Sequence, residues 1–389
     1  MTTFETAFAR HLNPRVIYDQ LLDHESLTRD ELSKLTGLTR VAASASVKHL
    51  VGRGLALPVE TAAGEGGPAA RRYALTPTAG YVVAAHITHG NVTMAAADLT
   101  GTLAAKLELP FEDPDDAASM LHRAVVGCLD MAGADIGRLR RVVLGSPGVI
   151  DPRTGEFAFA TLLPNWQHTI TAELRRSLDR PVVFENDVNL AAMAEARFGH
   201  GQGVRHLAFA LLSDGIGLGL VLNGRLHRGR HGWAGEIGFL PAPMPNPHVE
   251  VAGMQKSTHQ LASTPAIAAL SAAAGFGSDP AIAVTMASAA LAAHKPQDAG
   301  AEAFLDEVAR RVALVVSHAC LLVDPEVLVL DGSYLVAGGD ALLDRICLAV
   351  ARISPTPVRL TLAEVHDEPI LRGALQTALE DARETLFAG

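Results

Sequence analysis

Residues 185–189 read Glu-Asn-Asp-Val-Asn and directly follow an apolar run at Val182–Phe184. Polar side chains at the end of a predicted strand mark an edge of the sheet where ligands bind. Five further motifs lie around this segment in the chain: Gly145–Asp151 (GSPGVID), Leu163–Trp166 (LPNW), Gly215–Gly219 (GIGLG), Asn223–Gly229 (NGRLHRG) and Ala234–Gly238 (AGEIG). One such motif alone would be a weak signal, but six in this order are a strong one.

The chain from Tyr81 onward alternates between predicted strands and Ala-rich helices, which predicts an α/β fold with mixed sheets. A final helix at Leu371–Leu386 carries an apolar stripe, so we expect it to pack against the first lobe of this body and link it to the N-terminal domain. The predicted strands are Tyr81–Ala85, Asn91–Ala97, Leu103–Leu109, Arg141–Leu144, Val182–Phe184, Leu207–Leu212 and Val327–Leu330.

Composition indicates a folded protein of two or three domains: 389 residues, 49% hydrophobic and 19% charged. The net charge of −10 argues against a protein that coats nucleic acid over its whole surface. Residues 1–75 nevertheless hold nine Lys/Arg against eight Asp/Glu, so the acidity lies in the rest of the chain. Three distant cysteines and the lack of long apolar runs predict a cytoplasmic protein without a membrane partner.

The N-terminal region carries the pattern of a helix-turn-helix. Pro14 to His24 has helical apolar spacing, and Thr28 and Glu31 form a capping box that predicts the start of a second helix. That helix ends at Gly37, and a third helix is predicted from Thr39 to Gly52. Helix, short glycine turn and helix in this order predict a DNA-binding unit.

Two short strands around a polar tip (Ala63 to Pro68) complete a predicted wing, and Arg71 and Arg72 are placed to meet phosphates or a minor groove. We therefore predict a winged helix-turn-helix domain over residues 1–78. A three-helix protein-interaction module remains the alternative. The residues of the third helix predicted to face a DNA groove are Thr39, Arg40, Ser44, Ser46 and Lys48.

The six motifs closely resemble the ROK family (repressors, open reading frames and sugar kinases) over about residues 80–389. The resemblance implies an α/β actin-like ATPase fold, here a two-lobed, sugar-kinase-like, ligand-sensing body over residues 79–389. Together with the predicted winged domain, the layout is similar to that of the family's repressors.

The resemblance also implies where a kinase of this family would hold ATP, and this sequence departs there. The first phosphate loop, Asp-Ile-Gly-Gly-Thr in the kinases, maps onto His86–Gly90 (HITHG), so the acid and both glycines are absent. We expect the side chains of Thr88 and His89 to take the space of phosphate oxygens. In the second loop Asp214 replaces a hydroxyl residue, and a carboxylate would repel phosphate. The late glycine pair is Asp331–Gly332. These departures predict that the chain is not an enzyme and uses no cofactor.

The sugar half of the site is expected to remain. Asn186 and Asp187 match the family positions that grip sugar hydroxyls, Glu236 matches a third contact, and Gly148 of GSPG is placed with them. His259 falls where the family places a sugar-binding Glu, by an ungapped count. The alternatives left open are an Asx-type turn for the Asn186–Asp187 pair, a capping or ion-paired role for Glu236, and an exposed loop position for His259.

The family's zinc site is expected to be absent. Its His ligand corresponds to Phe239, and its cysteines map onto Glu250, Ala252 and Ser257, which leaves no thiolate. No metal site is predicted elsewhere.

The sequence therefore predicts a sugar-responsive transcriptional regulator of carbohydrate metabolism genes, most readily a repressor. Its expected partners are operator DNA, a monosaccharide effector and a second copy of the chain, as a homodimer or homotetramer. Two rival hypotheses stay open: an active sugar kinase with a DNA-binding domain attached, and a sensor whose body binds a protein partner.

Overall fold

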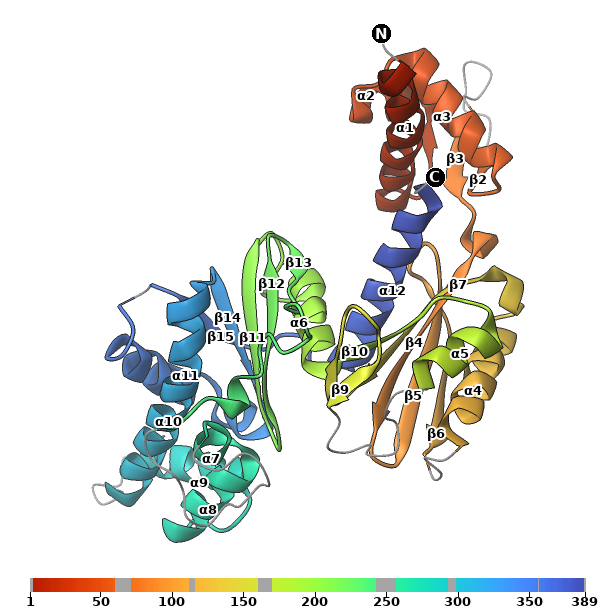
Figure 1. Cartoon of the computed structure of the whole chain (residues 1–389). Helices are drawn as coiled ribbons and strands as arrows, with labels where there is room; N and C mark the ends of the chain where they lie inside the picture. The colour runs from red at the N-terminus through yellow and green to blue at the C-terminus, as the bar shows by residue number, and fades with distance from the viewer. Residues whose placement is uncertain are drawn as a thin grey trace.

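The chain folds into a head and a body of two lobes, joined by one long helix, as Figure 1 shows. The computed structural model describes all residues except 1–2, 60–70, 112–115, 160–169, 243–256, 293–298, 356 and 388–389, and only the backbone of residues 3–12. Within the described part, no helix has both the length and the apolar composition needed to cross a lipid bilayer.

In its described residues the head has three helices and an antiparallel sheet of three short strands in the order β1-β3-β2. The predicted capping box is present: Thr28 and Glu31 bond each other's backbone amides at the start of α2. Gly37 ends that helix with φ 69°, and Thr39 caps α3. The head elements are α1 (Thr3–Asp23), β1 (Leu27–Thr28), α2 (Arg29–Thr36), α3 (Arg40–Gly52), β2 (Ala56–Val59) and β3 (Arg72–Leu75).

The head differs from the sequence prediction in the start of its first helix and in one additional strand. The first helix begins at Thr3, and Pro14 lies inside it, not at its start. Strand β1 had no sequence signal, because it is only two residues long and pairs with β3. The strands on both sides of the predicted wing are present, but its tip (Ala63 to Pro68) lies outside the described residues.

Each lobe of the body is built on a five-stranded mixed sheet, and the two sheets have the same strand order. In both, three consecutive antiparallel strands are extended by two parallel ones. All seven predicted strands are present. The first sheet is β6-β5-β4-β7-β10, with β4 (Tyr81–Thr88), β5 (Asn91–Asp98), β6 (Leu103–Pro110), β7 (Leu139–Ser146) and β10 (Val182–Asn186). The second is β13-β12-β11-β14-β15, with β11 (His206–Leu212), β12 (Ile216–Leu222), β13 (Arg225–Leu226), β14 (Val327–Asp331) and β15 (Arg359–Leu362).

Helices cover both faces of each sheet. On the first lobe these include α4 (Ala117–Met131) and α5 (Ile170–Leu178), beside the small hairpin β8 (Val149–Ile150) and β9 (Phe157–Phe159). The second lobe carries α7 (His259–Ala262), α8 (Thr264–Ala273), α9 (Pro280–Ala292), α10 (Ala299–Val323) and α11 (Ser333–Ala351).

Helices α6 (Asp187–Phe198) and α12 (Pro369–Phe387) pack on each other between the two sheets, as Figure 1 shows. Helix α12 covers the first sheet and α6 covers the second. Gly219 makes the second contact close, because a Cβ there would lie 2.5 Å from the Cβ of Ala192 in α6. The glycines of the GIGLG motif therefore let a helix lie directly on β12.

Candidate functional site

Asn186 lies where β10 ends and α6 begins. Its Oδ1 accepts a hydrogen bond from the amide of Asn189 at 3.1 Å, and its Nδ2 donates to the carbonyl oxygen of Gly148 at 3.0 Å. Gly148 has φ 121°, a region that favours glycine. An asparagine amide can make four hydrogen bonds, so the residue that caps α6 keeps one N–H and one lone pair for a ligand. Asn186 thus has the local turn role that the sequence left open, and this role still leaves one N–H and one lone pair free for a ligand.

Asp187 and Glu236 come from different lobes and lie close enough to interact electrostatically. Burial raises the pKa of Asp187, and burial together with the charge of Asp187 raises the pKa of Glu236 to about 7. Gly235 shapes the turn before Glu236: it has φ 94°, and a Cβ there would lie 1.8 Å from the carbonyl oxygen of Leu218. One protonated and one ionised carboxyl group can donate to and accept from the hydroxyls of a neutral ligand.

The raised pKa of Glu236 predicts a pH effect on stability. Because its folded-state pKa of about 7 lies above the ordinary 4.5, the folded protein keeps a proton that the unfolded chain releases. Wild-type protein should therefore lose stability relative to Glu236→Gln as the pH rises from about 4.5 to 7. Urea unfolding of both proteins across this range measures the difference. A difference in unfolding free energy between the two proteins that stays constant with pH would contradict the raised pKa of Glu236.

His259 begins α7 and is buried, which excludes the exposed loop position that the sequence left open. Its Nδ1 has no hydrogen-bond partner within the described residues. Burial lowers the pKa of His259, and the charge of Asp214 in the β11–β12 turn acts in the opposite direction. A buried ring nitrogen without a partner is costly unless a ligand or water satisfies it, so this residue remains a candidate contact.

An ion pair joins the two lobes beside this site, and the sequence reasoning did not find it. Arg228, which follows β13, donates through Nε to the buried carboxylate of Glu185 in β10. Glu185 also accepts a hydrogen bond from Nδ2 of Asn189 at 2.8 Å. The same segment comes so close to β8 that a Cβ on Gly232 would lie 2.0 Å from the carbonyl oxygen of Ile150. The signals available in the sequence were the acid before Asn186 and the arginine in NGRLHRG.

The outer face of α3 carries most of the predicted DNA contacts of the head. Thr39, Arg40 and Lys48 are exposed, and Ser44 is half-buried. Arg40 lies 3.2 Å from Asp30 at a side-chain exposure of 77%. The same face of α3 also exposes Val41, at 80%, Ala45 and His49. Of these three, the sequence had indicated only Ala45, as a small residue that allows close approach to DNA.

Two residues predicted to contact DNA have other roles. Ser46 is buried, because it shares a helix stripe with the core residues Ala43, Val47 and Leu50, so it cannot face a groove. Arg72 is half-buried in β3, where it bonds Ser26 and pairs with Glu31 at 3.2 Å. It therefore holds the sheet against α2. Arg71 is exposed.

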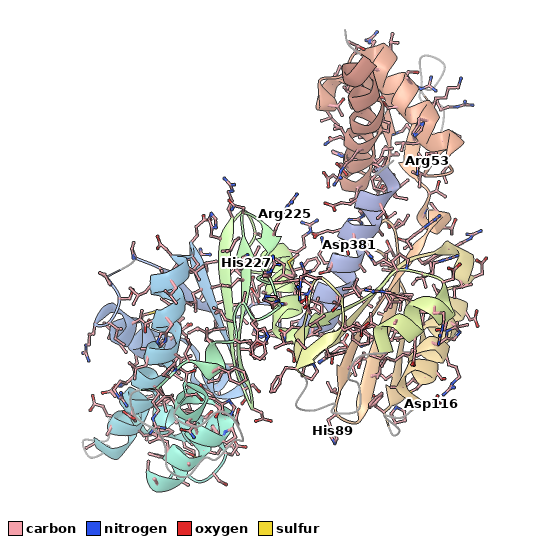
Figure 2. The ribbon with its side chains drawn as sticks, in the orientation of Figure 1. Arg53, His89, Asp116, Arg225, His227 and Asp381 are labelled. Atoms are coloured by element: carbon pink, nitrogen blue, oxygen red, sulfur yellow. The ribbon has the colours of Figure 1, made fainter. Side chains whose placement is uncertain are left out.

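Helix α12 connects the body to the head, as its apolar stripe predicted. The Arg53 guanidinium donates to the carbonyl oxygen of Leu386 at 2.7 Å, and the Tyr18 ring lies 5.5 Å from that of Phe387. Arg383 of α12 donates to the carbonyl oxygen of Leu99 at 2.9 Å, and the Tyr18 hydroxyl donates to the same oxygen. Figure 2 shows Arg53 beside the end of this helix. Since α12 also packs on α6, it reaches from the candidate ligand site to the head.

A model of the ROK family matches residues 84–380. The chain belongs to the ROK family. This confirms the resemblance of the six motifs, and with it the actin-like fold class of the body.

ROK relatives of this chain carry two kinds of name. A xylose repressor of Bacillus spizizenii is 24% identical over 247 residues, and a glucokinase of Halalkalibacterium halodurans is 31% identical over 158 residues. The match to the xylose repressor spans 62% of this chain and 63% of the repressor. The match to the glucokinase spans 39% of this chain and 47% of the glucokinase.

Solved ROK structures share the fold. A ROK family transcriptional regulator, a homologue of the E. coli Mlc protein, has a TM-score of 0.74 at 20% identity, covering 97% of this chain and 98% of its own. A ROK hexokinase of Thermus thermophilus has a TM-score of 0.66 at 27% identity, covering 78% and 99%.

The first two ROK phosphate-loop segments, His86–Gly90 and Ser213–Gly217, lie at the β4–β5 and β11–β12 hairpin turns and in the strand residues beside them. His89 is exposed in the β4–β5 turn, labelled in Figure 2, and its occupation of the space of phosphate oxygens stays a prediction. The Thr88 hydroxyl donates to the carbonyl oxygen of Asn91 within that hairpin. Asp214 is exposed in the β11–β12 turn. At the position of the late glycine pair, Gly332 leaves no room for a side chain, because a Cβ there would lie 2.2 Å from the carbonyl oxygen of Leu212.

The residue at the ROK zinc-histidine position, Phe239, belongs to an aromatic cluster. Its ring lies 5.7 Å from Trp233 and 6.0 Å from Phe159 of β9 in the other lobe. Of the three mapped cysteine positions, only Ser257 is described; it is buried and bridges to Pro241. Aromatic packing therefore joins the lobes at this position.

Proposed function

We propose that this ROK protein is a sugar-responsive transcriptional repressor: the head binds operator DNA, and the cleft between the lobes binds a neutral monosaccharide without phosphorylating it. The observation that carries the proposal is the continuous path from the ligand site to the head. Asn186 and Asp187 begin α6, α6 packs on α12, and α12 ends in the head's core.

The surface of the head supports a DNA role. The order of elements in residues 1–78 is that of a winged helix-turn-helix. Helix α3 exposes Arg40 and Lys48 to solvent. Arg71 lies at the start of β3, beside the wing. Cations on an exposed helix are placed to contact phosphates, and small residues such as Ala45 allow close approach to base edges.

The chemistry of the cleft supports binding without catalysis. Asp187 has the position of a general base, but Asp214 brings a negative charge to the second phosphate turn, and the first turn lacks paired glycines. At an effective dielectric of about 20, two like charges about 4 Å apart repel by about 4 kcal/mol. The xylose repressors among the relatives favour the same reading, and the glucokinases make kinase activity the rival to test.

A change in the angle between the lobes is the proposed signal. Asp187 and Glu236 come from different lobes, so one sugar bound to both would draw the lobes together. Two chains in a dimer would then alter the spacing of their heads on the half-sites of an inverted repeat. Coupling of this kind amounts to about 1–3 kcal/mol, or about five- to 150-fold in DNA affinity.

The test combines DNA selection with a sugar panel. Genomic fragments bound by the purified protein identify the operator, and gel shifts then follow DNA affinity with xylose, glucose and other neutral monosaccharides. We expect one sugar to change DNA affinity by about five- to 150-fold. Asp187→Ala should bind the operator like wild type but require at least about 100-fold more sugar, because a buried hydrogen-bonding partner is lost.

Asp116→Ala is the matched control, because Asp116 is an exposed acid at the start of α4, on the side of the first lobe away from the second lobe in Figure 2. It should respond to sugar like wild type. Sugar-dependent ADP formation from ATP that disappears in Asp187→Ala would replace the repressor by a kinase. Failure to bind any operator would remove the DNA-binding half of the proposal.

A further inference from the structure

A second, charged cavity lies on the first lobe beside the edge strand β10. It has a volume of about 320 Å³ and lies between β10, the turn joining β8 to β9, helix α5, Arg228 of the second lobe, and α12. Glu185 lines it, but the residues of the proposed sugar site do not: Asn186, Asp187, Glu236 and His259. The cavity is therefore separate from the proposed sugar site.

Three guanidinium groups, Arg153, Arg175 and Arg228, line this cavity with two carboxylates. Most of these charges are already paired. Arg228 pairs with Glu185, and Arg153 binds Asp151 through two nitrogens and holds the pKa of Asp151 at about 2, so that pair stays ionised. The other lining acid, Asp381, pairs with Arg141 of β7 at 2.9 Å.

Arg175 is the exception. No carboxylate of the described residues lies within ion-pair distance of it, so its positive charge is uncompensated there. Its Nε donates to the carbonyl oxygen of Val182 at 2.8 Å, which fixes the group at the edge of β10. Gly155 makes room for it: the glycine has φ 73°, and a Cβ there would lie 2.7 Å from Nη2 of Arg175. The guanidinium is thus held in place while its two terminal nitrogens make no hydrogen bond with the described residues.

We propose that this cavity binds a phosphoryl group, as inorganic phosphate or as the phosphate of a small phosphorylated metabolite. A positioned guanidinium with free terminal N–H groups matches two phosphate oxygens at once. Arg153 and Arg228 add donors from the hairpin and from the second lobe, and the volume leaves room for a few carbon atoms beside the phosphate. Asp381 of α12, shown in Figure 2, also lines the cavity, but Arg141 compensates its charge at 2.9 Å, so the lining keeps the positive charge of Arg175.

Calorimetric titration of the full chain with inorganic phosphate and with glucose 6-phosphate tests the site, with glucose as the uncharged comparison. We expect saturable binding of at least one phosphate compound at millimolar concentrations or below. Arg175→Gln should weaken it at least tenfold. Arg176→Gln is the matched control, because Arg176 is the next residue of α5 and lines a different hollow, with His122 and Glu173. It should bind like wild type.

The two phosphate compounds distinguish the source of the ligand. Tighter binding of the ester supports a phosphorylated metabolite, and equal or tighter binding of inorganic phosphate supports free phosphate. Equal losses in Arg175→Gln and Arg176→Gln would show unspecific attraction and overturn the site, as would no saturable binding to wild type. Thermal melts of both variants verify that they fold. The result does not depend on whether the head binds DNA.

Discussion

Gly373→Ala should destabilise the first lobe by about 3 kcal/mol, although it adds a single methyl group. Gly373 lies in α12 where that helix crosses α6, and a Cβ there would lie 1.8 Å from the carbonyl oxygen of Leu190. A backbone oxygen inside a helix cannot move alone, so the two helices must separate. Urea unfolding followed by circular dichroism measures the loss.

Gly127→Ala provides the control for this change. Gly127 is also a helical glycine, in α4, but a Cβ there would meet nothing within 4 Å. Alanine forms helix more readily than glycine by about 1 kcal/mol, so this variant should be slightly stabilised. If both variants shift in the same direction by similar amounts, the close crossing of α6 and α12 does not determine the stability of this region.

Glu195→Ala should cost about 3–5 kcal/mol of folding free energy. Glu195 is fully buried in α6. Its Oε1 accepts hydrogen bonds from the amides of Glu364 and Val365, both at 2.7 Å, and Oε2 accepts one from the amide of His200 at 3.2 Å. The first two amides belong to the segment that leads from β15 into α12. Without the carboxylate these donors lose their partner, and a cavity forms.

Glu326 is the control for Glu195, because its carboxylate also accepts hydrogen bonds from two backbone amides but lies at the surface. Its Oε1 accepts from the amides of Arg205 and His206 at 2.8 and 2.9 Å, but the residue is exposed. Water can replace the carboxylate there, so Glu326→Ala should cost less than about 1 kcal/mol. Chemical denaturation of both variants compares them directly. Similar losses of unfolding free energy in the two variants would mean that burial does not determine how much these hydrogen bonds stabilise the fold.

Local sequence signals predicted most of the elements. The capping box at Thr28 and the glycine at position 37 placed α2 correctly, because both act within a few residues. All seven predicted body strands are present, since runs of β-branched and apolar residues dominate them. Two glycines of the motifs, Gly235 and Gly219, lie in close contacts that allow no side chain.

Features that depend on tertiary contacts were not predictable from one sequence. Ser46 was assigned to the DNA-facing side of α3 because it is polar, yet it lies in the stripe that packs on the head's core. Arg72 looked like a wing residue, but its partners Ser26 and Glu31 are over 40 residues away. The cavity around Arg175 combines segments from both lobes and α12, so no local pattern marks it.

The head's core has a consequence for biosynthesis. Leu386 and Phe387 pack against the cluster that contains Tyr18 and Leu50, and Arg53 bonds the Leu386 carbonyl oxygen. The head thus lacks part of its interior until Leu386 and Phe387, more than 300 residues further along the chain, are translated. A nascent chain stalled before α12 would carry an unfinished head, so only a chain translated through this helix would present the complete domain.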